Sequence, residues 1–159
     1  MHRNTSYLEQ MFREVISVSN KPKLFRDPIH GFIEVPTTLQ PLIDTYEFQR
    51  LRRLTQLGVT PLIFHGAEHS RFGHSLGTMH LFNRIVKRFD EKGVSLTEEE
   101  RLVGMVTALL HDIGHGPFSH VLERFLTPGR KHEYWTVQVV TGDTAINKLS
   151  DYMCLIKNA

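Results

Sequence analysis

The sequence predicts an all-α fold, a helical bundle with one small N-terminal β-hairpin. Apolar residues recur at helical spacing along most of the 159 residues, whereas only residues 23–35 have β-rich ends around a proline and glycine turn. The hydrophobic content of 40% suits one globular domain with its own core. We therefore expect an N-terminal helix and linker over residues 1–22 and a single helical domain over residues 23–159.

The first elements are predicted from apolar spacing and turn residues. A short helix is expected near residues 8–16, before a polar linker. The hairpin follows over residues 23–35, with its turn between Pro28 and Gly31. Apolar residues between 39 and 57 then predict two helices in tandem, the second of them capped near Asp44-Thr45.

The later elements have clearer start and stop signals. A long helix is expected over residues 69–89 and is stopped by Lys92-Gly93. Thr97 and Glu100 stand at the spacing of a capping box, so the next helix begins there. That helix ends at His111-Asp112, because glycines and a proline follow. Further helices are expected from Phe118 and from Lys131 to Leu155.

Charge and cysteine content exclude several function classes. The 19 basic and 17 acidic side chains leave a net charge of +2, too small to favour nucleic acid or an anionic membrane as a partner. Cys154 is the single cysteine and has no partner for an internal disulfide. No segment approaches the roughly 20 apolar residues that span a bilayer. A cytoplasmic location is expected, with the nucleus as the alternative in a eukaryotic cell.

Three metal-type ligands stand in two short and unusual contexts. His111 and Asp112 are adjacent, and His74 precedes them by 37 residues. Imidazole together with carboxylate suits zinc, manganese or iron better than calcium, and such sites keep positions open for water or phosphate. The pattern therefore predicts metal-assisted hydrolysis. A lone histidine is more often a core or surface residue, and that interpretation is preferred for His2, His30, His65 and His80.

Two further groups of polar residues are candidates for a functional site: three histidines after the doublet and a run of arginines before it. His115, His120 and His132 follow closely and are candidates for proton transfer or phosphate contacts. The run Gln49 to Arg53 holds three arginines, which indicate either a solvated helix face or a phosphate site. The sequence favours the solvated face. Nucleic-acid binding is the weakest alternative, because no aromatic residue stands among the arginines.

Several ordered motifs resemble the HD superfamily of metal-dependent phosphohydrolases, and within it the deoxynucleoside triphosphate (dNTP) triphosphohydrolase branch of vertebrates and bacteria. The resemblance extends from about Lys23 to Val140. The motifs that carry it are Asp27-Pro28-Ile29-His30-Gly31, Phe48-Gln49-Arg50-Leu51-Arg52, Gln56-Leu57-Gly58, His69-Ser70-Arg71-Phe72-Gly73-His74-Ser75-Leu76-Gly77 and His111-Asp112-Ile113-Gly114-His115-Gly116-Pro117-Phe118-Ser119-His120.

The resemblance implies an HD-domain helical bundle that hydrolyses a dNTP to the deoxynucleoside and inorganic triphosphate. It implies a manganese, iron or zinc ion, with magnesium accompanying the nucleotide. The residues that match the branch are assigned as follows: metal ligands His74, His111 and Asp112; phosphate contacts Arg71 and His115; acid or base candidates His120 and His132; and sugar contacts Gln56 and Leu57.

The branch also implies an allosteric nucleotide site and a homo-oligomer. The matching positions here are Lys23, Asp44, Gln49 and Arg52, where the aspartate and glutamine would contact a guanine. GTP or dGTP is then the expected activator.

The chain departs from the family pattern at its C-terminal side. The pattern needs a fourth metal ligand, an aspartate far downstream of the doublet, and the sequence given ends at Ala159. The later aspartates Asp143 and Asp151 do not stand in a matching motif. We expect a domain truncated at its C-terminus, with an exposed apolar surface and a tendency to oligomerise. Two alternatives to the triphosphohydrolase remain: a non-catalytic nucleotide-binding or regulatory module, and another HD-type phosphohydrolase such as a phosphodiesterase.

Overall fold

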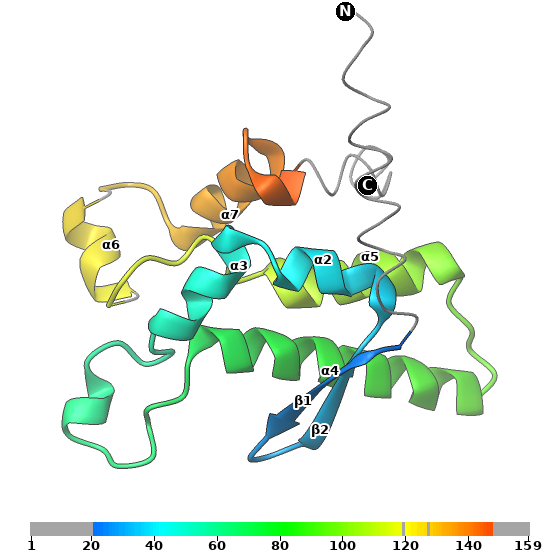
Figure 1. Cartoon of the computed structure of the whole chain (residues 1–159). Coiled ribbons are helices and arrows are strands. Elements are labelled where there is room, and N and C mark those ends of the chain that lie inside the picture. The colour runs from blue at the N-terminus through cyan, green and yellow to red at the C-terminus, as the bar shows by residue number, and fades with distance from the viewer. Residues whose placement is uncertain (1–20, 119, 127, 148–159) are drawn as a thin grey trace, which may run out of the picture.

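The fold is mostly helical and contains one two-stranded antiparallel sheet (Figure 1). The computed structural model describes residues 21–118, 120–126 and 128–147. The helix expected near residues 8–16 lies outside the described residues. The predicted combination of a helical bundle with a small hairpin is confirmed.

The hairpin consists of β1 (Lys23–Asp27) and β2 (Gly31–Val35), paired so that Phe25 lies opposite Ile33. Asp27 closes the turn, because its Oδ1 accepts the backbone N–H groups of Ile29 and His30 at 2.9 and 2.8 Å. Gly31 has a φ of +76°, which a side chain would disfavour. The hairpin was therefore predicted correctly, including its turn.

The segment after the hairpin differs from the two continuous helices that the apolar spacing predicts. It breaks into short turns: the 3-10 helix η1 (Thr37–Leu39), α2 (Gln40–Ile43), α3 (Tyr46–Gln49), and the 3-10 helices η2 (Arg50–Arg53) and η3 (Thr60–Leu62). Thr45 caps α3 as expected, since its side chain accepts the N–H of Phe48.

Helical structure ends before residue 57 because the backbone there bonds to a distant segment. Leu54 is extended, and its carbonyl accepts the N–H of Arg71 at 2.8 Å. Thr55 forms an isolated β-bridge with Ser70. The expectation of helix up to Leu57 was thus wrong, because apolar spacing does not reveal this tertiary pairing.

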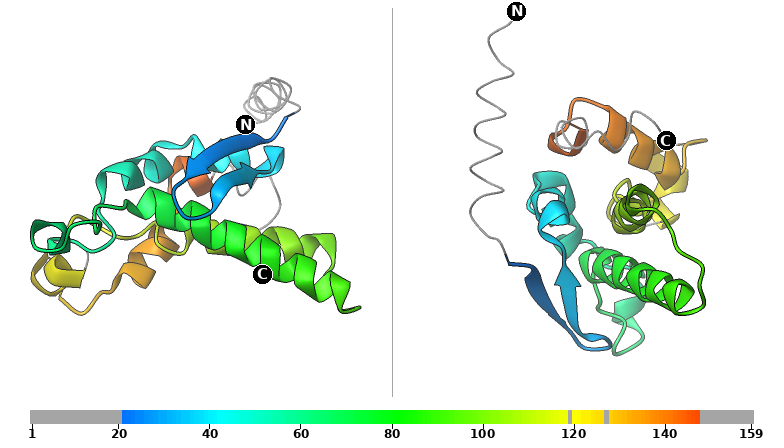
Figure 2. Two further views of the ribbon diagram at one scale, coloured as in Figure 1. Left: turned by 90° about the horizontal axis from the view of Figure 1, so that it is seen from below. Right: turned by 90° about the vertical axis from the view of Figure 1, so that its right-hand side faces the viewer.

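The two long helices are α4 (Arg71–Glu91) and α5 (Glu98–Leu110), which run antiparallel and lie side by side (Figures 1 and 2). Gly93 follows α4 with a φ of +78°, as the stop signal predicts. The capping box at Thr97 and Glu100 is confirmed, with reciprocal bonds of 2.8 and 3.2 Å. Each end of the predicted turn between the helices is therefore explained by a local signal.

A single apolar core fills the space between α4, α5, the hairpin and the short helices. Phe72 connects these layers, because its ring lies edge-on to both Phe25 and Phe48. Gly104 lets the two long helices approach, since a Cβ at that position would meet the Phe82 ring at 2.0 Å. The core residues that are essentially inaccessible are Ile33, Val35, Leu39, Leu42, Ile43, Phe48, Leu51, Met79, Leu109, Ile113 and Ile146.

The turn after α5 is followed by α6 (His120–Leu126) and α7 (His132–Thr141). The helix expected from Lys131 to Leu155 is interrupted, because the backbone is extended at Gly142; it bends through residues 142–144 and is helical again at residues 145–147. Residues 148–159 lie outside the described residues. Thr136 on α7 contacts the turn after α5, where its Oγ1 accepts the N–H of Gly114 at 3.0 Å and donates to the carbonyl of His111 at 3.1 Å.

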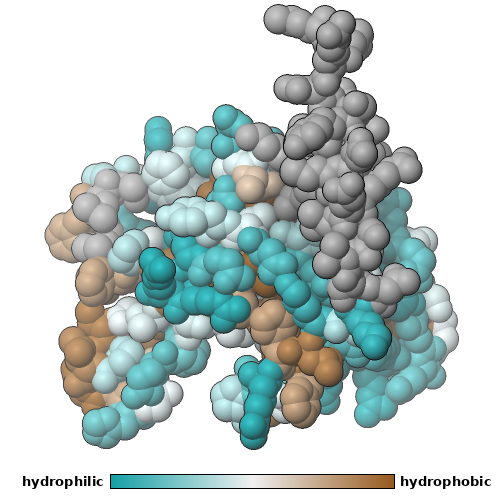
Figure 3. Space-filling view, in the orientation of Figure 1, coloured by the Kyte–Doolittle hydropathy of each residue, from teal (hydrophilic) through white to brown (hydrophobic). Residues whose placement is uncertain are grey.

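Exposed apolar side chains gather at one end of the molecule, where the brown surface of Figure 3 covers residues 57–64 and α6. The two segments approach closely at Gly58, where a Cβ would lie 3.2 Å from the carbonyl oxygen of Phe118. The exposed apolar residues at this end are Leu57, Val59, Leu62, Ile63, Phe64, Phe118, Val121 and Phe125. An exposed apolar surface was expected. Among the described helices, none combines the length and apolarity needed to cross a membrane.

Candidate metal centre and histidine cluster

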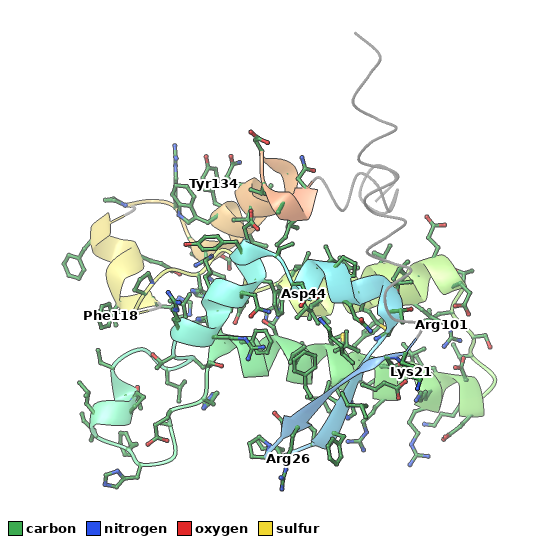
Figure 4. The ribbon with its side chains drawn as sticks, in the orientation of Figure 1. Lys21, Arg26, Asp44, Arg101, Phe118 and Tyr134 are labelled. Carbon is green, nitrogen blue, oxygen red and sulfur yellow. The ribbon has the colours of Figure 1, made fainter. Side chains whose placement is uncertain are left out.

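The antiparallel packing of α4 and α5 brings the three predicted metal ligands to one end of the helix pair. His74 lies in the first turns of α4, and His111 and Asp112 directly follow the last residue of α5. This end is the one that carries Phe118, opposite the end where Arg101 pairs with Asp90 (Figure 4). Residues separated by 37 positions therefore converge on one point.

The ring nitrogens of His74 and His111 face one another. Their Nε2 atoms are 3.2 Å apart, and the ring planes differ by 66°. The other ring nitrogen of His111, Nδ1, donates to the carbonyl of Ala108 at 2.9 Å, which leaves Nε2 with a lone pair directed at His74. A backbone carbonyl at the second nitrogen is the usual way to orient a metal-bound histidine.

Asp112 completes the group. Its Oδ1 lies 3.4 Å from His111 Nε2, and its Oδ2 lies 3.6 Å from His74 Nε2. Four-coordinate zinc with Zn–N distances of about 2.0–2.1 Å places neighbouring ligand atoms about 3.4 Å apart. The three ligand atoms, which all lie within 4.8 Å of one another, thus fit one divalent transition metal ion.

Arg71 holds the carboxylate of Asp112 from the protein interior. Its Nη1 donates to Asp112 Oδ2 at 2.6 Å, and the two side chains are only 2% and 7% exposed. Burial alone would raise the pKa of Asp112, but the neighbouring charges of His111 and Arg71 outweigh it and lower that pKa. Asp112 is therefore ionised at neutral pH and available as a ligand.

The sequence analysis predicted a phosphate contact for Arg71 and did not predict its ion pair with Asp112. At 2% exposure the guanidinium is enclosed, and a phosphate could touch it only after a side-chain movement. Its Nη2 also donates to the backbone carbonyl of Gln56 at 3.3 Å. The phosphate contact stays a prediction, whereas the structure shows a contact with the carboxylate of Asp112, a candidate metal ligand.

A second cluster lies beside the first and contains the other three predicted histidines. The Nδ1 atoms of His115 and His132 lie 3.2 and 3.4 Å from Glu123 Oε1, and His120 Nδ1 makes a hydrogen bond of 3.2 Å with Glu123 Oε2. His115 is buried at 2%, whereas the His120 side chain is 68% exposed. The cluster therefore extends from the protein interior, where His115 Nε2 faces Asp112 Oδ1 at 3.6 Å, to the surface.

Distances alone would allow this second cluster to hold a metal as well, but ring orientation favours the first. The rings of His115 and His132 stack at 3.8 Å with planes only 13° apart. An imidazole lone pair lies in the plane of its ring, so two parallel stacked rings cannot both direct lone pairs at one ion. The rings of His74 and His111, at 66°, can do so.

Glu123 was missed by the sequence analysis. It contacts all three histidines of the cluster, and its pKa is lowered although burial opposes this, because His120 and the other imidazoles favour the carboxylate. The available signal was its position three residues after His120 on one helix, a spacing that lets side chains meet.

Burial sets the charge state of the innermost histidine. Desolvation, helped by the positive charge of Arg71 and the neighbouring His132, lowers the pKa of His115 to about 4. His115 is then neutral at pH 7 and can act as a hydrogen-bond donor or acceptor there, but not as a cation. Burial likewise lowers the pKa of His74, which favours the neutral form that binds metals.

The predicted sugar contacts stand in the loop beside the metal site. Gln56 Nε2 approaches Asp112 Oδ2 at 3.5 Å, and Leu57 is 46% exposed. The structure thus brings Gln56 next to the candidate metal centre and leaves Leu57 accessible to a ligand. Their part in recognising a deoxyribose stays a prediction.

The four predicted allosteric positions form two polar pairs. Lys23 Nζ contacts Asp44 Oδ2 at 2.5 Å, and Arg52 Nε donates to Gln49 Oε1 at 2.8 Å. Arg52 also stacks over Phe72, with the guanidinium carbon 3.6 Å from the ring centroid. The arginine run is therefore not one uniform solvated face, because Arg50 points instead at the turn after α5.

Comparison with known proteins supports the same family. The HD-domain family model matches residues 71–154. The uncharacterised protein YwfO of Bacillus subtilis is 45% identical over 131 residues, which cover 82% of this chain and 30% of YwfO. Proteins named deoxynucleoside triphosphate triphosphohydrolase SAMHD1 are similar: that of Danio rerio is 40% identical over 150 residues, 89% of this chain and 24% of its own length. The human protein is 45% identical over 117 residues, 72% of this chain and 19% of its own.

Solved structures agree with these relatives. A phosphohydrolase from Bacteroides thetaiotaomicron has a TM-score of 0.70 and 33% identity, over 85% of this chain and 32% of its own. A hypothetical protein from Aquifex aeolicus has a TM-score of 0.69 and 40% identity, over 82% and 33%. The chain thus spans about a third or less of the proteins it matches. The ligand geometry fits this result, and the family match shows that this chain belongs to the HD-domain family.

Proposed function

We propose that the protein hydrolyses deoxynucleoside triphosphates to the deoxynucleoside and inorganic triphosphate. The observation that carries the proposal is the convergence of His74, His111 and Asp112, next to a histidine and glutamate cluster that can handle protons and phosphate. The likeness to proteins named for this activity, at 40–45% identity in the relatives reported above, supports the choice of substrate.

His74, His111 and Asp112 would hold a manganese, iron or zinc ion. Such an ion, when bound, polarises the phosphate and lowers the pKa of water. Arg71 keeps Asp112 ionised and fixes its Oδ2 by the 2.6 Å contact. The Nδ1–H of His111 is held by the carbonyl of Ala108, so Nε2 keeps its lone pair for the ion. Magnesium is expected to accompany the nucleotide.

The reaction adds water at the phosphorus next to the sugar and breaks the bond from that phosphorus to the 5′ oxygen of the sugar. The water proton needs a base, and the 5′ oxygen needs a proton to leave as a hydroxyl. His120 is the accessible candidate for the acid, since its Nδ1 is held by Glu123 and its Nε2 is left for the substrate. His115 and His132 stand deeper and would contact phosphate oxygens or pass protons to Glu123.

Substrate selection is assigned to the loop that carries Gln56 and Leu57. An apolar side chain against the 2′ carbon of the sugar would accept a deoxyribose and leave a ribose hydroxyl without a partner. Leu57 is accessible for such a contact, and Gln56 stands next to the metal ligand Asp112. Leu57→Ser is therefore expected to narrow the difference in kcat/KM between dGTP and GTP.

We further propose that GTP or dGTP activates the protein as a homo-oligomer, through Lys23, Asp44, Gln49 and Arg52. The two polar pairs formed by these residues offer a cation, a carboxylate and an amide within reach of solvent, a set that suits the phosphates and base of a guanine nucleotide. Asp44→Ala should abolish activation by GTP and leave the basal rate unchanged.

The test is incubation of the purified protein with each dNTP and manganese, with and without GTP, with the products separated by chromatography. Deoxynucleoside and inorganic triphosphate are expected, and both should be lost in His111→Ala and Asp112→Ala. His65→Ala is the matched control, because His65 is exposed and lies outside both clusters.

Two other outcomes would replace this proposed function with an alternative. Release of a monophosphate, or opening of a cyclic nucleotide, would identify another HD-type phosphohydrolase or phosphodiesterase. Retention of metal and nucleotide without any product would identify a non-catalytic nucleotide-binding or regulatory module.

A further inference from the structure

Arg50 contacts the turn that carries the site and does not point at solvent. It belongs to η2, and its Nη1 donates to the backbone carbonyl of His115 at 2.7 Å. Its Nη2 donates to the carbonyl of Ile113. Both bonds join residues more than sixty positions apart in the sequence, since Arg50 precedes these acceptors by 65 and 63 residues.

These two carbonyls lie just beyond the end of α5, where carbonyl groups no longer accept the N–H of a following helical turn. A guanidinium presents a rigid fork of donors, so it can fix two acceptors in one orientation, whereas a lysine ammonium is a single point charge. Among the described residues, no carboxylate forms an ion pair with Arg50. Burial lowers the pKa of Arg50, and the nearby Glu47 carboxylate offsets this only in part, so the two carbonyls are important acceptors for a half-buried guanidinium.

The same turn is held from its other side by α7. Thr136 bonds to the N–H of Gly114 and to the carbonyl of His111. A Cβ at Gly114 would meet the backbone N of Thr136 at 2.2 Å, so the turn and α7 are in close contact. The turn is thus clamped between η2 and α7, and the positions of Asp112 and His115 depend on both clamps.

We propose that Arg50 is a positioning residue, which sets the place of the His115 ring between Asp112 and Glu123 without touching the substrate. The inference rests on the proposed function, because it assumes that His115 acts on the phosphate. It makes a specific claim about kinetics: loss of Arg50 should reduce turnover and not substrate binding.

The experiment compares Arg50→Ala and Arg50→Lys with Arg53→Ala, an exposed arginine in the same short helix. A displacement of about 1 Å at a catalytic group can cost about 100-fold in rate. We expect kcat of Arg50→Ala to fall by about that factor with KM changed less than about threefold. Arg50→Lys should recover part of the rate, because it can keep one carbonyl, and Arg53→Ala should match the wild type.

A second readout does not depend on activity. Correlation spectra of the histidine ring nitrogens at pH 7 should show the His115 signals shifted or broadened in Arg50→Ala and unchanged in Arg53→Ala. His30 and His80 stand on the hairpin and the middle of α4, and serve as internal controls. If the wild type turns over no dNTP, the proposed function fails and these spectra alone decide the role of Arg50.

The proposal is overturned if kcat stays at the wild-type value, or if KM alone rises, which would place Arg50 on the substrate. It is also overturned if kcat falls only in proportion to the unfolded fraction, measured by urea denaturation, while the His115 signals stay in place. Should Arg50→Ala not fold, the same comparison is made with Arg50→Lys, for which an intermediate loss of kcat is expected and wild-type turnover would refute the proposal.

Discussion

Removal of Arg71 should strongly destabilise the protein when no metal is present. The change to make is Arg71→Met, which keeps most of the side-chain volume and deletes the charge. Arg71 and Asp112 are 2% and 7% exposed and bonded at 2.6 Å, so the variant leaves a buried carboxylate without its counter-ion. Loss of one partner of such a pair costs about 3–5 kcal/mol in the free energy of unfolding.

A double-mutant cycle separates the pair from the packing of each residue. Asp112→Asn removes the carboxylate charge that Arg71→Met leaves unpaired. The double variant should therefore lose less free energy of unfolding than the sum of the two single losses, by about 2 kcal/mol. Urea denaturation in the presence of a chelator, followed by far-ultraviolet circular dichroism, measures each free energy. The buried ion pair would be refuted if each single variant lost less than about 1 kcal/mol in the free energy of unfolding, and the loss in the double variant equalled their sum within about 0.5 kcal/mol.

A bound metal should reduce the loss of stability caused by Arg71→Met. The ion stabilises the wild type by about 2.7 kcal/mol at a concentration one hundred times its Kd. It also supplies positive charge next to Asp112, so Arg71→Met should lose less stability with manganese than with chelator. Equal losses under both conditions would show that the ion does not bind at this carboxylate.

The remaining predictions concern the elements that position the site. Thr97→Ala removes the capping box of α5 and should cost about 0.5–2 kcal/mol in urea denaturation. Thr107→Ala, at an exposed position of the same helix, should cost nothing. Gly104→Ala should destabilise by about 1–3 kcal/mol despite its better helix propensity, because the new Cβ would overlap the Phe82 ring. Leu109→Ala, at a fully buried position, should cost about 2–5 kcal/mol, and a value under about 1 kcal/mol would contradict the core described here.

The elements that were predicted from the sequence are those with local causes. The start of α5 follows from a capping box, the end of α4 from a glycine with positive φ, and the hairpin from an aspartate and glycine turn. Each signal acts within a few residues, so it can be read without knowledge of the fold. Two of the three candidate metal ligands could be found in the same way, because His111 and Asp112 are adjacent at a predicted helix end; their role as ligands stays a prediction.

What the sequence did not reveal depends on contacts between distant segments. The helices between residues 39 and 57 are short because Leu54 and Thr55 pair with the start of α4. The partner of Asp112 is Arg71, 41 residues away, and the arginine run is divided because Arg50 reaches the turn after α5. Such pairings depend on packing geometry, which apolar spacing and motif matching do not contain.

The central claim is that one metal ion at His74, His111 and Asp112 supports the release of triphosphate. The direct test measures bound metal by elemental analysis after dialysis, together with triphosphate release from dGTP, on the wild type, His74→Ala and His65→Ala. We predict about one tightly bound ion per chain, with triphosphate as the product, in the wild type and His65→Ala, and loss of both in His74→Ala. Full metal content or full triphosphate release in His74→Ala would contradict the claim.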